Sequence, residues 1–368
     1  MDILEEACKR EAANEKIIHM EIGQPGARAP ATVIEAAQVA LSDGYFGYTE
    51  ARGIAPLRDR IARHYRETYG VDILENRIIV TTGSSAGFSF AFLGAFDSGD
   101  RVALTAPGYP AYRNILKALE LEPVESPVEE ETRWVLTPEL LEWAHTEKPL
   151  KGVLVANPGN PSETMMQPVA LKALCESTRD LGITFISDEI YHGLVYRGET
   201  ASALNYSDEA IVINSFSKYY CMTGWWIGWM IALEALVRSI ERIAQSLYIC
   251  APDISQRAAL AAFDATPKLE VVKQCYAKNR ELLLDVLPKI GFNELLPVDG
   301  AFYVYAGVRS LTNDSSNFAR RMLAEAGIAT TPSADFDHDR GPGYLCFSFA
   351  GLHEDMVEAT ERLARWLA

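Results

Sequence analysis

Nearly continuous apolar runs alternate with helix-like segments through the middle of the chain. The runs are rich in Val, Ile, Leu and Ala, and they cover residues 77–82, 101–107, 152–158, 184–190 and 210–217. The segment SAGFSFAFLGAF (85–96), between the first two runs, suits a buried helix. Apolar strands that alternate with helices predict an α/β fold whose central, mostly parallel sheet is flanked by helices on both faces. Ligands on such a sheet bind at the carboxyl ends of its strands.

A different pattern follows toward the C-terminus. Two long helical stretches come first, at 233–265 and 267–287. Strand-like runs and helices then alternate, with strands at 300–306 and 344–351 and helices at 315–326 and 353–367. This order predicts a large domain at 31–270 and a smaller α+β domain at 271–368. Residues 1–30 are expected to pack on the small domain or on a partner subunit.

Composition and charge narrow the classes of function. Apolar residues make up 48% and charged residues 23% of the chain, as in ordinary globular proteins. The formal net charge of −16 disfavours binding to nucleic acid or to anionic membranes, which both need basic patches. No stretch approaches the roughly 20 apolar residues of a membrane span, and the charged N-terminus lacks a signal-peptide pattern. The six cysteines show neither a CxxC pair nor metal-finger spacing, so we expect no metal site and a reducing, cytoplasmic location.

Three polar loops follow predicted strands. Each could bind part of a ligand, or it could serve only the structure of the chain. In TTGSSAG (81–87), Ser84, Ser85 and the first amides of the next helix could bind a phosphate, or a serine could simply cap the helix. In APGYP (106–110), Tyr109 could stack on a flat ring or pack as an ordinary tyrosine. In NPGNPSE (157–163), Asn160 could donate to a phenolic oxygen, or the segment could be a turn of the kind that Asn, Gly and Pro favour.

The next two strand ends carry ionisable groups. SDEIY (187–191) ends a buried strand with Asp188 and Tyr191. A carboxylate there needs a cationic partner, which could be a pyridinium nitrogen or an ordinary salt bridge. NSFSK (214–218) ends the following strand with Lys218, after Ser215 and Ser217. A lysine desolvated at this edge has a lowered pKa, and its neutral amine is nucleophilic.

In this order, SSAG, PGYPAY, NPGNP, SDEIY and SFSK resemble the motifs of fold-type I enzymes that use pyridoxal 5′-phosphate (PLP), specifically the class I/II aminotransferases. The matching elements run from about Gly23 to Gly351, nearly the whole chain. The resemblance implies a fold-type I PLP-dependent transferase that moves an amino group between an amino acid or amine and a keto acid. It also implies a homodimer with shared active sites.

The resemblance further implies how the ring of PLP is held. Lys218 forms a Schiff base with PLP and moves the proton of the substrate carbon. Asp188 pairs with the pyridine nitrogen and keeps it protonated, so that the ring acts as an electron sink. Tyr191 and Asn160 hold the phenolic oxygen, and Tyr109 stacks on the ring.

The phosphate and the substrate are assigned by the same resemblance. Four serines surround the phosphate: Ser84, Ser85, Ser215 and Ser217. Tyr48, in GYTEARG, matches the family tyrosine that reaches the phosphate of a neighbouring subunit. Gly23, in EIGQPG, lines the pocket for the substrate carboxylate, and Asn160 also faces the substrate.

Two positions depart from the family pattern. The family has a G-x-R-x-G segment whose arginine binds the PLP phosphate, but here Trp226 occupies that place in GWWIG (224–228). An indole offers one N–H and no charge, so cofactor binding should weaken by about 1.5–3 kcal/mol unless other groups compensate. In GYLCFSFAG, Cys346 stands where the family arginine binds the substrate carboxylate. Arg340, in HDRGPG, is the nearby candidate to replace it.

These departures leave other functions open. The substrate could lack a free α-carboxylate, or the enzyme could catalyse a PLP-dependent elimination, cyclisation or oxidation. A low-activity PLP-binding or regulatory protein is a further alternative. The regulatory alternative is disfavoured, because the chain begins almost directly with the aminotransferase-like segment and its negative charge opposes DNA binding.

Overall fold

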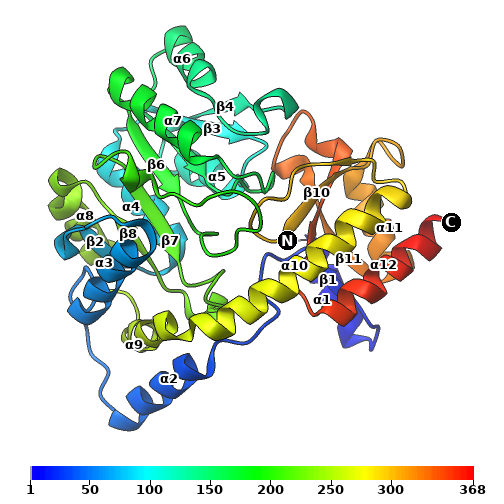
Figure 1. Cartoon of the computed structure of the whole chain (residues 1–368), viewed down its shortest axis with the longest axis horizontal. Helices are drawn as coiled ribbons and strands as arrows, with labels where there is room; N and C mark the ends of the chain where they lie inside the picture. The colour runs from blue at the N-terminus through cyan, green and yellow to red at the C-terminus, as the bar shows by residue number, and fades with distance from the viewer. Residues whose placement is uncertain (1) are drawn as a thin grey trace.

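The computed structural model describes residues 2–368, which form two sheets with helices around them (Figure 1). The larger sheet has seven strands in the order β2-β8-β7-β6-β5-β3-β4. Their bounds are β2 Ile78–Thr81, β3 Arg101–Ala106, β4 Glu122–Pro127, β5 Gly152–Ala156, β6 Thr184–Asp188, β7 Ile211–Ser215 and β8 Gly228–Ile231. Strands β3 to β7 run parallel to one another, whereas β8 is antiparallel to β2 and β7. The sheet is therefore mostly parallel, as the apolar runs predict.

Successive strand residues enter hydrophobic clusters on opposite faces of this sheet. Ile79 and Leu154 pack with α4, α5 and α8, whereas Val80 and Val153 pack with α2, α3, α6, α7 and α9. These helices span α2 Ala31–Asp43, α3 Ala55–Tyr69, α4 Gly83–Ala95, α5 Pro110–Ala118, α6 Pro138–Glu147, α7 Pro168–Leu181, α8 Glu234–Leu247 and α9 Asp253–Ala262. Because side chains alternate along a strand, burial of both faces requires apolar residues at every position.

The smaller sheet has five strands in the order β1-β11-β12-β10-β9. Their bounds are β1 Ile18–Met20, β9 Glu294–Leu295, β10 Tyr303–Gly307, β11 Ile328–Pro332 and β12 Tyr344–Ser348. The helices beside this sheet are α1 Asp2–Ala12, α11 Ser315–Ala326 and α12 His353–Leu367. Strand β1 pairs in parallel with β11, so the N-terminal segment lies on the small domain.

The helical stretch expected at 233–265 is divided into α8 and α9. Ile249 has a left-handed backbone, with φ 66°, two residues after α8 ends at Leu247. Pro252 then precedes the first residue of α9. A proline lacks the N–H that a continuing helix needs, and it disfavours helical geometry at the residue before it. Apolar periodicity alone therefore overestimated the length of this helix.

Helix α10, Thr266–Lys289, connects the two domains (Figure 1). Its Leu269 belongs to the hydrophobic core of the large domain and its Leu283 to that of the small domain. The boundary predicted at residue 270 falls in the first turns of this helix. Although α10 has 24 residues, neither it nor another helix in the described part of the chain is long and apolar enough to cross a membrane.

Candidate active site

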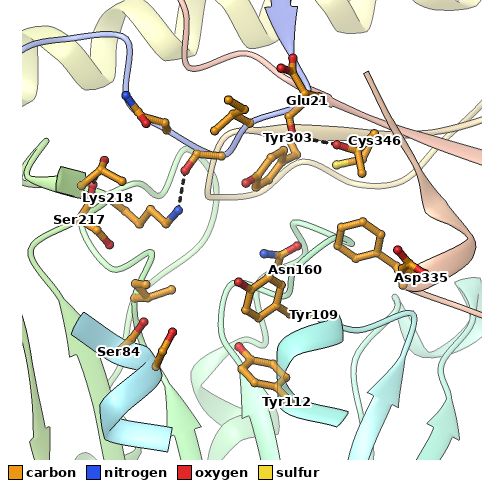
Figure 2. Close-up of a pocket in the computed structure, with 18 of the residues that line it drawn as sticks. Glu21, Ser84, Tyr109, Tyr112, Asn160, Ser217, Lys218, Tyr303, Asp335 and Cys346 are labelled. Atoms are coloured by element: carbon orange, nitrogen blue, oxygen red, sulfur yellow. Dashed lines mark hydrogen bonds between the residues drawn. The ribbon is translucent and has the colours of Figure 1, made fainter. Parts of the chain in front are cut away.

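A cavity of about 760 Å³ lies at the carboxyl ends of the large-sheet strands. Its lining comes from both domains and from the segment that follows β1. Figure 2 shows Lys218 pointing into this space, opposite Asn160 and Tyr109, with Cys346 at the small-domain side. The volume is within the range of pockets that bind small molecules and cofactors.

Lys218 follows β7 and places its amino group in the cavity. Its Nζ donates a hydrogen bond to the carbonyl oxygen of Gly23, at 2.5 Å. Burial lowers the pKa of Lys218 from 10.5 to about 8, although the nearby Asp188 and Glu163 carboxyl groups oppose this shift. A Cβ at position 23 would lie 1.5 Å from Tyr303 Oη, so only glycine fits there. Lys218 and Gly23 are thus brought together from positions 195 residues apart.

Asp188 ends β6 and is 3% exposed. Its Oδ1 accepts from the Ile190 amide at 3.1 Å, and its Oδ2 accepts from the Tyr112 hydroxyl. Burial raises the pKa of Asp188 to about 6, while these two donors and Lys218 act in the opposite direction. Tyr112 is a site residue that sequence reasoning missed. Its only signal was its place as the second tyrosine of PGYPAY, on the first turn of α5.

Tyr191, Asn160 and Tyr109 also line the cavity. Asn160 Nδ2 donates to Tyr191 Oη at 3.2 Å, which fixes both side chains relative to each other. Tyr109 meets Tyr112 edge to face, with ring centroids 5.3 Å apart. Tyr109 lines the cavity and is 39% exposed, so part of its side chain remains available to a flat ring there.

The serines gather at the N-terminus of α4, as the sequence predicts. Ser84, Ser85, Ser215 and Ser217 all line the cavity. No side-chain hydrogen bond caps the first turn of α4, so its amides and the positive end of the helix dipole are available to an anion. Ser215 Oγ donates to Ser217 Oγ at 3.0 Å and accepts from the Ser217 amide, so the two serines lie together.

Trp226 lines the same cavity as these candidate phosphate-binding groups. It is 64% exposed and has a left-handed backbone with φ 50°. No arginine of residues 2–368 lines the serine-rich end of the cavity. The α4 terminus and the serine hydroxyls are therefore the groups that could hold a phosphate here.

Cys346 lies on β12 at the other end of the cavity and is buried. It pairs with Thr331 of β11 across the sheet. Burial raises the pKa of the Cys346 thiol well above its ordinary value, so this position supplies a neutral side chain. A carboxylate at this end would meet no cation from position 346.

Arg340 does not lie in the cavity, contrary to the expectation from its sequence position. Its guanidinium donates to the carbonyl oxygens of Ala106 at 2.6 Å and Val128 at 3.1 Å, and to Asp337 at 2.7 Å. These bonds orient the side chain toward the loop after β3. Arg340 therefore does not replace the arginine that is absent at position 346.

Tyr48 also lies outside the cavity and is 82% exposed. It lines a separate hollow with Leu41, Phe46 and Tyr248. The family resemblance implies that Tyr48 reaches the PLP phosphate of a neighbouring subunit. An exposed position is compatible with that role only if the chain forms a dimer. Within residues 2–368, no cluster of three His, Cys, Asp or Glu side chains has the geometry of a metal site.

This arrangement of a buried lysine, a buried carboxylate and a helix N-terminus at one sheet edge is typical of enzymes that bind a phosphorylated aldehyde cofactor. Residues 15–363 match the family "Aminotransferase class I and II". The chain belongs to this family and is an aminotransferase, and the fold-type I architecture predicted from its motifs is confirmed. The family implies PLP as the cofactor.

Similar proteins cover the full length of the chain. A valine–pyruvate aminotransferase from Mycobacterium tuberculosis is 44% identical, over 100% of this chain and 95% of its own. A (5-formylfuran-3-yl)methyl phosphate transaminase from Methanocaldococcus jannaschii is 35% identical, over 100% and 96%. The crystal structure of a putative aminotransferase from Silicibacter pomeroyi has a TM-score of 0.93 and 48% identity, over 100% and 95%.

Proposed function

We propose that this chain binds PLP covalently through Lys218 and transfers an amino group between an amino acid or amine and a keto acid. The observation that supports this most directly is the buried Lys218 amine in the same cavity as the Asp188 carboxylate. The residues fit the cofactor at three points. A lysine with a lowered pKa suits its aldehyde, a buried carboxylate suits its ring nitrogen, and the uncapped α4 terminus suits its phosphate.

When bound, PLP supplies an electron sink for the carbon that carries the amino group of the substrate. Lys218 would serve as the base that takes the proton from that carbon and delivers it to C4′ of the cofactor. Asp188 keeps the ring nitrogen protonated, and Tyr112 and the Ile190 amide hold the carboxylate in place. Asn160 and Tyr191 orient the phenolic oxygen through their mutual hydrogen bond. Tyr109 covers a face of the ring.

The phosphate of the cofactor is proposed to bind without an arginine. Ser84, Ser85, Ser217 and the amides of the first turn of α4 supply neutral donors at one place. The helix dipole adds positive potential there. Trp226 lines the same end of the cavity and contributes one N–H at most.

The proposed function is tested by absorbance and product analysis. Purified protein is incubated with PLP and then with a panel of amines and amino acids, each with pyruvate or 2-oxoglutarate as acceptor. We expect a visible band, its loss on addition of the amino donor, and a new amino acid derived from the acceptor. Protein that forms no band at saturating PLP would contradict covalent binding, and band loss that yields only elimination products would contradict amino-group transfer.

The pKa of Lys218 leads to a pH prediction. Lysine must be neutral to attack an aldehyde, and burial lowers its pKa from 10.5 to about 8. Below pH 8 the amine is mostly protonated, so the rate of covalent PLP binding should rise about tenfold per pH unit and level off above pH 8. Stopped-flow absorbance between pH 6 and 10 measures this rate. A rate that still rises steeply at pH 9.5 would show that the lysine is not desolvated in solution.

We also propose that the chain forms a homodimer through an exposed apolar patch. The patch joins the end of α2 and the loop after it to the end of α8: Leu41, Tyr45, Phe46, Tyr48, Leu247, Tyr248 and Ile249, each at least 41% exposed. Four of its members line one hollow, so the two segments are adjacent. Contiguous exposed apolar surface of this kind marks protein–protein contact sites. Tyr48, the most exposed member of the patch at 82%, would then reach the neighbouring active site.

Two variants separate the roles of this patch. Phe46→Asp places a charge in the apolar contact and is expected to yield monomers at micromolar concentration, measured by sedimentation. Tyr48→Phe removes only a hydroxyl, so the dimer should persist while PLP affinity falls by about 10- to 100-fold, the value of one hydrogen bond to a charged group. A monomeric wild-type protein that binds PLP tightly would contradict both proposals.

A reducing, cytoplasmic location is part of the same proposal. All six cysteines of the chain are free in the structure. Proteins of oxidising compartments more often pair their cysteines.

A further inference from the structure

Glu163 is a buried carboxyl group in the loop that follows β5 and carries Asn160 to the cavity (Figure 2). Its backbone has φ 58°, in the left-handed region that glycine adopts readily and glutamate does not. The Glu163 amide closes a turn by donating to the Gly159 carbonyl oxygen at 2.8 Å. An ionisable residue thus occupies a position that disfavours it twice, by burial and by backbone geometry.

Both the backbone and the side chain of Glu163 contact the segment that leads into β10. Its carbonyl oxygen accepts from the amides of Asp299 at 2.9 Å and Gly300 at 3.1 Å. Its Oε2 accepts from the Tyr303 amide at 3.2 Å, whereas Oε1 is buried and has no hydrogen-bond partner among residues 2–368. The oxygen of a glutamine side chain could make the same contact with Tyr303. This bridge between two segments therefore does not explain why the side chain is an acid.

The groups that interact electrostatically with the Glu163 carboxyl group include one thiol, three phenols and one amine. They are Cys346, Tyr191, Tyr196, Tyr303 and Lys218. Burial raises the pKa of the thiol and of the three phenols well above their ordinary values, so these groups are neutral near pH 7. Burial also raises the pKa of Glu163, and the charge of Lys218 opposes this rise. Lys218 is thus the group of this set that can balance a negative charge on Glu163.

Lys218 has a second carboxyl neighbour, Asp188, which has other partners. Burial lowers the pKa of Lys218 to about 8, and Asp188 and Glu163 are the carboxyl groups that oppose this shift. Asp188 accepts from Tyr112 and from the Ile190 amide, and in the proposed function it also pairs with the ring nitrogen of the cofactor. Once Asp188 is committed in this way, Glu163 remains to balance a charge on Lys218.

We propose that Glu163 is a positioning residue that stabilises the ammonium form of Lys218 while the lysine carries the substrate proton. The proposal rests on the aminotransferase function proposed above. The neutral Lys218 amine takes the proton from the carbon that bears the amino group, and the electron pair of the broken C–H bond passes to the cofactor. The lysine then gives the same proton to C4′ of the cofactor and becomes neutral again. Glu163 does not line the cavity, so it acts on the substrate only through Lys218.

The first test measures the charge of Lys218 in the absence of the cofactor. PLP-free wild type, Glu163→Gln and the control Glu21→Gln are labelled with trace acetic anhydride between pH 6 and 10. Acetylation of Lys218 is quantified by peptide mass spectrometry, with the half-exposed Lys172 as internal reference. Only a neutral amine reacts, and an opposite charge nearby typically shifts a pKa by about 1–3 units. We therefore expect Glu163→Gln to label Lys218 about 3- to 10-fold faster at pH 7 and equally fast at pH 10.

Glu21 is a matched control because it lines the cavity, and its side chain is bonded to His19 at 2.7 Å. It is not among the groups that shift the pKa of Lys218. Glu21→Gln should therefore leave the labelling of Lys218 unchanged.

The second test uses PLP-loaded protein and an amino donor deuterated at the reacting carbon. Glu163→Gln should lower the maximal rate of band loss by about 3- to 30-fold, because the ammonium form of Lys218 is less stable. The half-saturating donor concentration should stay within about twofold, since Glu163 does not line the cavity. The deuterium isotope effect on the maximal rate should increase, because proton transfer becomes slower relative to the other steps.

Glu163→Gly is a second variant without the carboxyl group, and glycine adopts φ 58° without strain. It should reproduce the labelling change even if Glu163→Gln folds poorly, as judged by its melting temperature. Unchanged labelling of Lys218 in both variants, or an equal change in Glu21→Gln, would overturn the proposal. A changed labelling rate with an unchanged maximal rate of band loss would overturn the role in proton transfer. A wild type without a visible band would instead contradict the proposed function, whatever the labelling shows.

Discussion

Lys218→Ala protein is expected to show no visible band with PLP and to lose aminotransferase turnover by at least about 10³-fold, because the same amine binds the cofactor and moves the substrate proton. No other lysine lines the cavity among residues 2–368, so no neighbour can replace it. The band is measured by absorbance after gel filtration, and turnover by formation of the new amino acid. PLP should still associate reversibly through the α4 terminus and Asp188.

The control for this variant is Lys172→Ala, which removes a half-exposed lysine on α7 that does not line the cavity. It should leave the band and the turnover unchanged. Lys218 contributes one backbone hydrogen bond, to Gly23, so its removal should change the melting temperature of the PLP-free protein by only a few degrees. A Lys218→Ala protein that keeps both the band and the activity would remove the basis of the proposed function.

The sheet edge could be predicted from the sequence because its determinants are local. Strand β6 is an apolar run that stops at Asp188, and β7 is another that stops just before Lys218. In a parallel sheet the carboxyl ends of such strands meet at one edge, whatever the exact strand order. The same rule places Asn160, which follows β5, and Tyr191, which follows β6, at this edge.

Other features depend on contacts that no local pattern records. Strand β8 has only four residues. The chain reverses direction between the end of β7 at Ser215 and the start of β8 at Gly228, so β8 pairs antiparallel with both β7 and β2. Arg340 is close to Cys346 in sequence, yet its guanidinium turns to Ala106 and Val128 of the other domain. The sequence does not distinguish Arg320 from the other arginines of the helices, and only the structure shows that it lines the cavity.

The two missing family arginines have different structural consequences. Trp226 lines the same cavity as the uncapped N-terminus of α4 and four serines, so neutral donors for a phosphate are present there without an arginine. Cys346 lies in a buried strand with Thr331 as its partner across the sheet. A substrate carboxylate near Lys218 would therefore meet the Asn160 amide and no cation from position 346.

Asp188→Asn is expected to lower the maximal turnover rate by about 10²- to 10⁴-fold, since removing one partner of a buried ion pair costs about 3–5 kcal/mol. Asparagine is nearly isosteric: its Oδ1 can still accept from the Ile190 amide, and its Nδ2 can donate to the Tyr112 oxygen once that hydroxyl turns away, so the site should keep its shape. What it loses is the negative charge that keeps the ring nitrogen of PLP protonated. The visible band should persist, because Lys218 is unchanged.

Tyr112→Phe is the matched control for Asp188→Asn, because it keeps the carboxylate and removes only the hydroxyl that donates to Oδ2. Its expected effect is smaller, about 10- to 100-fold in turnover, the value of one hydrogen bond to a charged group. A PLP analogue methylated at the ring nitrogen carries a fixed positive charge, so it should restore part of the activity of Asp188→Asn and none of that of Lys218→Ala. An equal loss in Asp188→Asn and Tyr112→Phe, without rescue by the analogue, would mean that Asp188 acts through packing rather than through its charge.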